Sequence, residues 1–229
     1  QLKKLSVNNI DENKSYITIK CDTICVSGGW TPTVHLFTQS KGKLKYRDLD
    51  GSFIPERAFQ NTLCVGSCNG DYDLHKILES IPSRVNNFLN LKDTEEKSYK
   101  TSEILYGNHQ NIWITSKKKI SKTKMFVDFQ NDVTAKDIKL ALKEGFQSIE
   151  HVKRYTTTGM ATDQGKISNV NALGIVSELS NTNISELGTT TFRLPYTPVT
   201  FGALAGRHVK EFFDLERTTP MHEWHKENG

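Results

Sequence analysis

The segment at residues 151–166 combines the side-chain types that bind phosphate groups. His151, Lys153 and Arg154 provide positive hydrogen-bond donors, which pair well with phosphate oxygens. Three adjacent threonines add hydroxyl and backbone donors, and two glycines, which lack a Cβ, let the backbone approach a ligand closely. The candidate anion-binding residues are His151, Lys153, Arg154, Thr156, Thr157, Thr158, Gly159, Gly165 and Lys166. Residues of these types bind and orient an anionic group, and none of them needs to do covalent chemistry.

A second interpretation of residues 151–166 is a solvated loop in which the threonines cap helix ends. Hydroxyl groups of Ser and Thr near a helix end often bond to the neighbouring backbone. In that case the segment has a structural role and binds no ligand. The residue types alone leave both interpretations open.

The elements around this segment are predicted to be three short helices. The first follows Thr134, the predicted N-cap, with Asp137 at the capping-box position, and ends before Gly145. A second helix is predicted at about 146–155 and a third at about 169–179, because apolar residues recur there at helical spacing. Three helices around the polar segment 151–166, which we call the hinge, make a small all-α unit.

In the first third of the chain, two apolar runs lead into glycine turns. Residues 21–26 are followed by Gly28 and Gly29, and residues 62–65 repeat the pattern before a helix predicted at 74–81. Strand, glycine turn and helix is the arrangement of a nucleotide site, because the bare backbone admits a phosphate and a helix N-terminus favours anions. Neither run is a complete G-x-G-x-x-G motif. Two ordinary tight strand ends are the alternative.

Other short elements are predicted on both sides of these motifs. Alternating polar and apolar residues indicate strands at 15–20 and 43–46. The tail at 188–229 is rich in Thr, Pro and Gly and is predicted to be extended, since residues before proline avoid the α region. Short helices are expected within it at 201–207 and from Pro220 onward.

Two groups of side chains suggest metal ligands, but neither has the spacing of a site. The first group is Cys21, Cys25, Cys64 and Cys68, two pairs with three residues between partners. Along an extended strand such partners lie about 13 Å apart, too far for one tetrahedral metal. Small buried thiols are the preferred interpretation. His222 and His225 lie three apart on a predicted helix without a third ligand. No metal site is predicted.

Composition excludes several classes of protein. A length of 229 residues allows one or two domains, and hydrophobic and charged contents of 36% and 24% are typical of soluble globular proteins. A net charge of +4, from 30 basic and 26 acidic residues, is too balanced to argue for nucleic acid. The apolar runs are too short to span a bilayer, and no signal-peptide pattern opens the chain. With unpatterned thiols, these features predict a cytoplasmic protein without a membrane or nucleic-acid partner.

The polar bridge at residues 86–124 is predicted to be a solvated linker. Its basic run at 117–119 lacks interleaved aromatic residues, which argues against nucleic-acid binding. The chain has no initiator Met and ends directly after a helix-like segment. We therefore expect it to be an internal or processed piece of a longer polypeptide.

Four segments of the chain resemble the α subunit of heterotetrameric sarcosine oxidase. They are residues 25–36, 126–137, 151–166 and 189–207. The resemblance extends over nearly the whole chain and is weakest at about 86–120. In that family the α subunit has an NAD-binding reductase-like part, then a small helical domain similar to bacterioferritin-associated ferredoxin. A folate-binding domain like the aminomethyltransferase of glycine cleavage follows.

The resemblance implies an α/β plus α fold in four parts. Residues 1–90 would be the end of an NAD/FAD-type dinucleotide-binding domain, and 91–124 a linker. Residues 125–187 would be the small helical domain. Residues 188–229 would connect it to the aminomethyltransferase-like folate-binding domain. The ferredoxin-like relatives hold an iron–sulfur cluster through cysteines, but residues 125–185 contain none, which excludes a cluster there.

The resemblance also implies a reaction, cofactors and partners. Sarcosine would be oxidatively demethylated to glycine, with FAD on the β subunit taking the hydride and FMN at the α/β interface passing electrons to oxygen. Hydrogen peroxide would form, and tetrahydrofolate would take the one-carbon unit as methylenetetrahydrofolate. The partners would be the β, γ and δ subunits. By resemblance, residues 151–166 face the FMN, and NAD contacts fall on Gly28, Gly29, Cys68, Asn69 and Leu74.

Two other functions remain open at this point. The helical unit could dock a partner subunit and bind no cofactor here. Alternatively, the chain could belong to a related amine oxidase or dehydrogenase that acts on an opine or on dimethylglycine. The sequence does not distinguish these amines, because the substrate would lie on another chain. The isolated piece is expected to be inactive.

Overall fold

A computed structural model describes most of the chain, and the statements below concern those residues. They are 5–7, 17–23, 25, 29–92, 98–102, 111–115, 117–210 and 216–229. Gly28, one of the predicted NAD contacts, lies outside them.

The strands form three separate antiparallel pairs. β1 (Leu5–Val7) pairs with β2 (Ile17–Ile19), β3 (Lys43–Arg47) with β4 (Ser52–Arg57), and β5 (Phe126–Asp128) with β6 (Val133–Thr134). The β3–β4 hairpin has one irregularity in register, between Lys43 and Leu44. The strands predicted at 15–20 and 43–46 are confirmed by β2 and β3. The fold mixes helices with small sheets, and within the described residues each sheet has only two strands.

In the described part of the first half of the chain there are two helices and a 3-10 turn. α1 (His35–Gln39) precedes the β3–β4 hairpin, and η1 (Gly66–Asn69) leads into α2 (Leu74–Leu89). α2 begins where the Asp73 carboxylate accepts the backbone N–H groups of His75 and Lys76, and it ends at Asn90 in a left-handed conformation. The helix predicted at 74–81 is confirmed and continues for two further turns.

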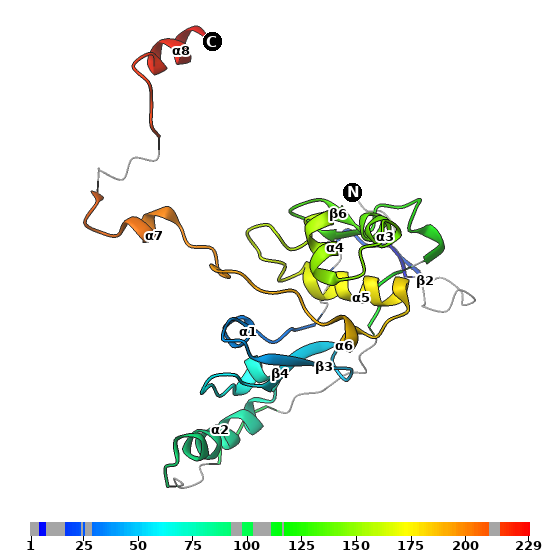
Figure 1. Ribbon diagram of the computed structural model, residues 1–229, viewed down its shortest axis with the longest axis vertical. Helices are drawn as coiled ribbons and strands as arrows, with labels where there is room; N and C mark the ends of the chain where they lie inside the picture. Colours follow the sequence, from blue (N-terminus) through cyan, green and yellow to red (C-terminus); the bar gives the residue numbers. More distant parts are fainter. Residues whose placement is uncertain are drawn as a thin grey trace.

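The second half contains the predicted helical unit. α3 (Ala135–Lys143) packs against α4 (Ile149–Thr156) and α5 (Ser168–Ser180), as Figure 1 shows. α3 begins with the predicted capping box, in which the Asp137 carboxylate accepts the N–H of Thr134 at 2.8 Å. All three predicted helices are confirmed, although α4 begins three residues later than expected.

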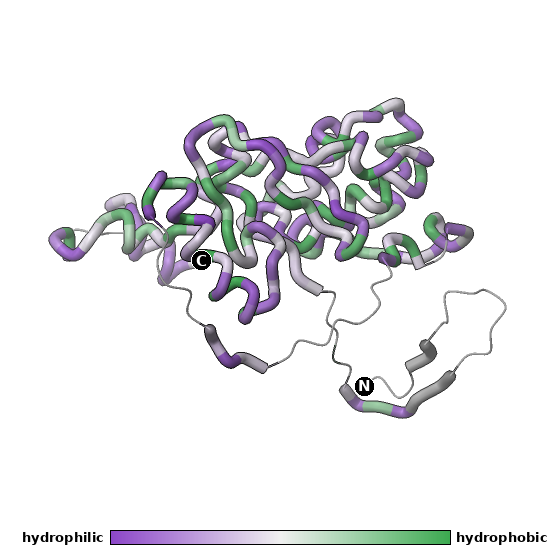
Figure 2. The backbone as a smooth tube through the Cα atoms, turned by 90° about the horizontal axis from the view of Figure 1, so that it is seen from below, coloured by the Kyte–Doolittle hydropathy of each residue, from purple (hydrophilic) through white to green (hydrophobic). Residues whose placement is uncertain are grey.

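The core lies between these helices and extends to the β3–β4 hairpin. Ile138, Val152 and Leu173, one from each helix, are at most 1% exposed. Phe53 of β4 belongs to the same buried cluster. α3 and α4 bury mainly one face each, whereas α5 is buried over the consecutive residues 172–176. Apolar and polar stretches alternate along the folded body in Figure 2. α6 (Ile184–Leu187) follows α5 and packs against both α5 and β3.

Part of the polar bridge is packed rather than solvated. Ile120, next to the short 3-10 helix η2 (Lys117–Lys119), is 1% exposed and lies in the main core. Trp113 packs against the same core, and its indole lies so close to Gly174 of α5 that a Cβ there would overlap the ring. The expectation of a solvated linker is therefore wrong for these residues. The division into four parts stays a prediction.

Two predicted strands are absent from the described residues. Residues 62–65 are irregular and lead into η1, and residues 21–23 and 25 are irregular as well. Short apolar runs are ambiguous, and none of the strands in the described residues pairs with these two runs. In contrast, β4, the β5–β6 hairpin and α6 are present although the sequence patterns did not predict them.

The tail is extended and carries two short exposed helices. α7 (Phe201–Ala205) begins at Thr200, whose hydroxyl accepts the N–H of Ala203, and α8 (His222–Asn228) begins two residues after Pro220. Figure 1 shows α7 lying away from the folded body. Helices predicted in both places are confirmed, but Pro220 is not the first helical residue.

Ile138→Ala should destabilise the helical unit by about 2–5 kcal/mol, because it empties a fully buried site between α3 and α5. Leu140→Ala on the same helix is the matched control, since Leu140 is 43% exposed and should cost less than about 1 kcal/mol. Urea unfolding of the full-length subunit, followed by the fluorescence of its tryptophans, measures both. Equal losses would contradict the placement of this core.

Candidate functional site

The threonines of the predicted anion-binding segment close the end of α4. The Thr156 hydroxyl donates to the carbonyl of Val152 at 2.7 Å and lies 2.7 Å from the hydroxyl of Thr158. Thr157 is the C-cap, with a left-handed backbone (φ 63°). Thr158 is 3% exposed. The Thr157 hydroxyl donates to the carbonyl of Thr156 at 2.6 Å, so all three hydroxyls are engaged within the protein, as the interpretation of structural caps expects.

A buried carboxylate holds the turn that follows. Asp128, at the end of β5, is 2% exposed. Its Oδ2 accepts the backbone N–H of Gly159 at 2.7 Å and the hydroxyl of Ser168 at 3.4 Å, and its Oδ1 accepts two further N–H groups, those of Gln130 and Asn131. The sequence analysis missed this residue. An Asp followed by turn-forming residues is the signal that could have identified it.

Gly159 and Gly165 are required by the packing of one amide. Both have left-handed backbones, with φ of 69° and 73°. A Cβ on either would overlap the side chain of Asn169, which lies against both and donates to the carbonyl of Gln164 at 3.2 Å. In this structure the side chain of Asn169 of α5 fills the space that the missing Cβ atoms leave at the two glycines.

Two charged residues of α4, Glu150 and Lys153, contact the tail. Residues 189–197, which we call the strap, run along α4: the Glu150 carboxylate accepts the N–H of Thr191 at 2.6 Å, and Lys153 Nζ donates to its carbonyl at 3.4 Å. Arg154 forms an ion pair with Glu150 at 3.0 Å. Arg193 of the strap adds a further positive charge near Lys153. Lys153 and Arg154 thus act on the Glu150 carboxylate, and Arg193 adds a third positive charge beside Lys153.

The pKa values reflect this excess of positive charge. Burial lowers the pKa of Lys153; Glu150 opposes this shift, and Arg193 and Arg154 add to it. Burial would raise the pKa of Glu150, but the hydrogen bond from Thr191 and the charges of Lys153 and Arg154 outweigh it, so that the pKa is lowered from 4.5. Glu150 is therefore the charged anchor of the strap at neutral pH.

Lys166 connects the hinge with a cleft on the other side of α5. Its Nζ donates to the carbonyl of Tyr196 at 3.0 Å and lies 4.4 Å from the centre of the tyrosine ring. The same ring stacks on His35, with centroids 4.0 Å apart. Burial and the charge of Lys166 lower the pKa of His35, whose buried Nδ1 has no hydrogen-bond partner.

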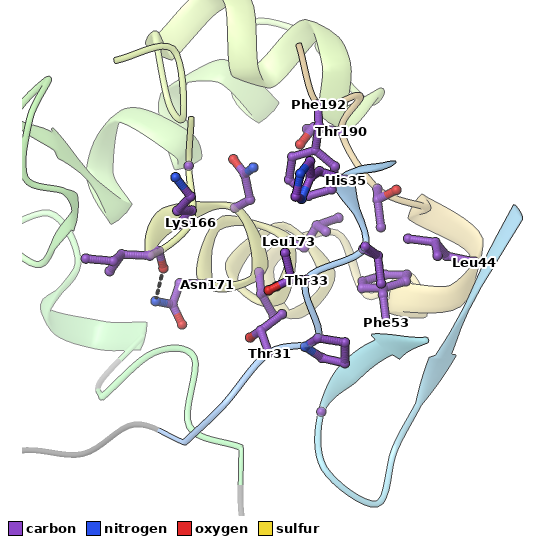
Figure 3. A pocket seen from close by; sticks show the side chains of 18 of the residues that line it. Thr31, Thr33, His35, Leu44, Phe53, Lys166, Asn171, Leu173, Thr190 and Phe192 are labelled. Atoms are coloured by element: carbon purple, nitrogen blue, oxygen red, sulfur yellow. Dashed lines mark hydrogen bonds between the residues drawn. The ribbon is translucent and has the colours of Figure 1, made fainter. Parts of the chain in front are cut away.

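The cleft has a volume of about 940 Å³ and lies between segments far apart in the sequence. Figure 3 shows its lining from the segment before α1, the β3–β4 hairpin, the start of α5 and the strap. Phe53, Leu173 and Phe192 give it apolar walls, and Lys166 supplies a positive charge. A concave apolar pocket with a few polar groups is a typical ligand site.

The predicted site residues fall into three places. The hinge residues 151–165 are brought together, and Gly165, Lys166 and Gly29 line the cleft. The remaining described NAD candidates lie apart from the cleft lining: Cys68 and Asn69 in η1, and Leu74 at the start of α2. No group of three or more potential metal-ligating side chains occurs among the described residues. Within that part of the chain, no helix has the length and apolar character needed to cross a membrane.

Comparison with known proteins gives a consistent result. A family model described as the sarcosine oxidase A3 domain matches residues 122–207. The chain is 38% identical over 218 residues to a sarcosine oxidase subunit alpha from Corynebacterium sp. (strain P-1), covering 92% of this chain and 22% of that protein. It is 36% identical over 231 residues to the subunit of the same name from Rhizobium meliloti (strain 1021), covering 99% and 23%.

The chain belongs to the sarcosine oxidase α-subunit family. A third subunit alpha, from Corynebacterium sp. (strain U-96), is 34% identical and matches 100% of this chain. The chain spans roughly a quarter of the length of these curated relatives, between 22% and 25%. The resemblance stated from the sequence is thus confirmed.

A solved structure shows where this fold occurs elsewhere. The crystal structure of L-proline dehydrogenase from P. horikoshii matches 83% of this chain and 40% of its own, with a TM-score of 0.58 and 19% sequence identity. At this identity the similarity concerns the fold alone. The mixed α and β content is supported, whereas the ferredoxin-like description of the helical unit stays a prediction.

Asp128→Asn should destabilise the helical unit by about 1–3 kcal/mol, because an amide NH2 would replace one of the two acceptor oxygens that meet four donors. Asp132→Asn is the matched control: Asp132 is exposed, has a left-handed backbone (φ 54°) that Asn tolerates, and should be nearly neutral. Thermal unfolding of the full-length subunit compares the two. A neutral Asp128→Asn would contradict the role of this carboxylate.

The attachment of the strap should weaken in acid. The pKa of Glu150 is lowered in the folded state, so its contribution is complete above about pH 4.5 and is lost as the pH falls through the folded value. Hydrogen exchange at the Thr191 amide, expressed as a protection factor, should therefore fall in acid in the native protein. Glu150→Gln should remove this pH dependence and lower the protection at neutral pH. An identical acid dependence in both proteins would exclude Glu150 as its source.

Proposed function

We propose that this chain is part of the α subunit of a multi-subunit flavoprotein sarcosine oxidase. The observation that carries the proposal is that subunits of this name align with 92–100% of the chain at 34–38% identity. The reaction would be the oxidative demethylation of sarcosine to glycine, giving hydrogen peroxide and methylenetetrahydrofolate. FAD would lie on the β subunit, and tetrahydrofolate on a part of the α subunit outside this chain.

Within that enzyme, the role of this chain would be to hold the phosphate of an FMN beside the hinge. A flavin supplies the electron transfer, while the protein binds and orients it. Lys153 and Arg154 are the groups best suited to the phosphate, because with Arg193 they leave an excess of positive charge around the single carboxylate of Glu150. His151 lies exposed on the same helix. The hydroxyls of Thr156 and Thr158 and the N–H of Gly159 would position the hinge rather than contact the ligand.

An FMN shared with a β subunit requires that the hinge lie at an interface. The loops at 126–131 and 157–166 lie side by side, since Asp128, Gln130 and Asn131 all bond to the second loop. Exposed apolar side chains accompany both loops. They are Phe126, Phe129, Met160 and Ile167, between 42% and 69% exposed. Apolar side chains of this size beside a charged hinge favour a docking surface for a partner subunit.

NAD would be bound separately from the FMN. Gly29, Cys68, Asn69 and Leu74 surround the turns that precede α1 and α2, where the backbone changes direction sharply. Most contacts there would come from the backbone. The γ and δ subunits would complete the assembly.

A second candidate function is a docking module of a related amine oxidase or dehydrogenase, acting for instance on an opine or on dimethylglycine. The exposed apolar residues of the two loops favour docking with or without a flavin. Cofactor content separates the two proposals.

Changing both Lys153 and Arg154 to Ala should lower the affinity of the assembled enzyme for FMN by at least about tenfold, because hydrogen bonds to charged groups contribute about 1.5–3 kcal/mol each. The matched control is Lys136→Ala with Lys139→Ala, which removes two exposed positive charges from α3. The ratio of FMN to FAD after dialysis of the purified complex measures the effect. An unchanged ratio in the first variant would reject the phosphate role and favour the docking module.

A further inference from the structure

Cys64 and Cys68 lie on either side of a sharp reversal of the chain before α2. Val65 is extended (φ −137°, ψ 156°). The chain then reverses its direction in η1, which begins at the buried Gly66. The Sγ of Cys68 reaches the carbonyl oxygen of Val65 at 3.0 Å. The second thiol therefore lies against the backbone that directly follows the first cysteine.

The two thiols also interact with each other. Burial raises the pKa of Cys64, the Cys68 thiol raises it further through its charge and a hydrogen bond, and Arg84 opposes both. Both cysteines are free and partly exposed. Cys21 and Cys25 have the same sequence spacing, but among the described residues no interaction joins their thiols. The turn at η1, and not the spacing, brings the first pair together.

Both ends of this turn are anchored. Arg84 of α2 donates to the carbonyl of Cys64 at 3.2 Å and pairs with Asp71 at 3.3 Å. Arg47 of β3 donates to the carbonyl of Gly70 at 2.8 Å. Because the backbone on either side is held, the two thiols stay neighbours rather than separating freely.

We propose that Cys64 and Cys68 form a reversible disulfide when the protein meets hydrogen peroxide. The source of the peroxide rests on the proposed function, in which oxygen is the electron acceptor. The bridge itself depends only on the local geometry and can be tested with added peroxide.

The chemistry is a two-electron oxidation in two steps. The thiolate of Cys68 attacks one oxygen of the peroxide, the O–O bond breaks, and a sulfenic acid and water form. Cys64 then attacks the sulfur of that sulfenic acid, which releases a second water and closes the S–S bond. Two thiols and one peroxide thus give one disulfide and two waters. Cys64 is the resolving thiol because its raised pKa leaves less thiolate for the first step.

Such a bridge should be easily reduced. It closes a ring that spans only three intervening residues, so it restricts the unfolded chain little and gains little stability. Partly exposed or strained disulfides have oxidising potentials and are the labile ones. Its formation would fix η1, where Cys68 and Asn69 are expected to contact the dinucleotide.

The test uses the full-length subunit in its purified complex and reads both cysteine pairs in one digest. The reduced protein is treated with hydrogen peroxide, free thiols are alkylated with iodoacetamide, and the protein is cut with trypsin. Residues 58–76 form one tryptic peptide that contains Cys64 and Cys68, and residues 21–41 form another that contains Cys21 and Cys25.

We expect peptide 58–76 to lose both alkylation sites and two hydrogens, and to recover both sites after treatment with dithiothreitol. Peptide 21–41 should stay fully alkylated. The proposal is overturned if peptide 58–76 remains alkylated, if both peptides are oxidised to the same extent, or if Cys68 becomes a sulfinic acid without a bridge. Cys64→Ser should leave a sulfenic acid at Cys68 that dimedone traps, whereas Cys68→Ser should leave Cys64 alkylated.

A second arm separates this proposal from the proposed function. The complex is given sarcosine and oxygen in place of peroxide, with and without catalase. A bridge that forms during turnover and is prevented by catalase supports both proposals. A bridge that forms with added peroxide but not with sarcosine supports the disulfide and counts against the oxidase reaction.

Discussion

The carboxylate of Asp128 is the interaction on which the hinge depends. It is buried, and it accepts four donors from three places: the turn after β5, the loop after α4 and the first residue of α5. Without that acceptor, the buried N–H of Gly159 and the buried hydroxyl of Ser168 would lose their partner, at a cost of about 1–3 kcal/mol for each unsatisfied group. Together with the apolar core that α4 and α5 share, this one side chain fixes the loop after α4 against the start of α5.

As a result, some polar groups of the hinge point into the protein and others point toward its surface. Hydroxyls and N–H groups bond to the protein backbone and to Asp128, the long side chains of Lys153 and Lys166 reach the strap, and Arg154 bonds to Glu150 on its own helix. The strap then connects the hinge to the cleft, because Thr191 meets α4 while Tyr196 meets Lys166 and His35. The strap therefore contacts both the helix that precedes the hinge turn and the lining of the cleft.

Local sequence patterns predicted the elements whose formation depends on residues close together in the sequence. The capping box at Thr134 and Asp137 and the apolar spacing of the three helices were sufficient to find the helical unit. The inward role of Asp128 was not predicted, because its partner Gly159 lies 31 residues away. The same limit explains the missed β5–β6 hairpin and the wrongly predicted strand at 62–65. Pairing partners and turns such as η1 are set by tertiary contacts that no local pattern contains.

The packing of Trp113 has a consequence for how the protein can be dissected. Its ring lies on the bare backbone at Gly174, and Ile120 fills the adjoining core, while Phe53 reaches the same cluster from the hairpin. A recombinant piece that begins after residue 124 would keep every helix of the family-model region, but it would expose the apolar surface of α5 that Trp113 and Ile120 cover. Expression of that region alone would then need residues 111–124. Replacing the exposed apolar residues of α5 with polar ones would be the route to a soluble minimal unit.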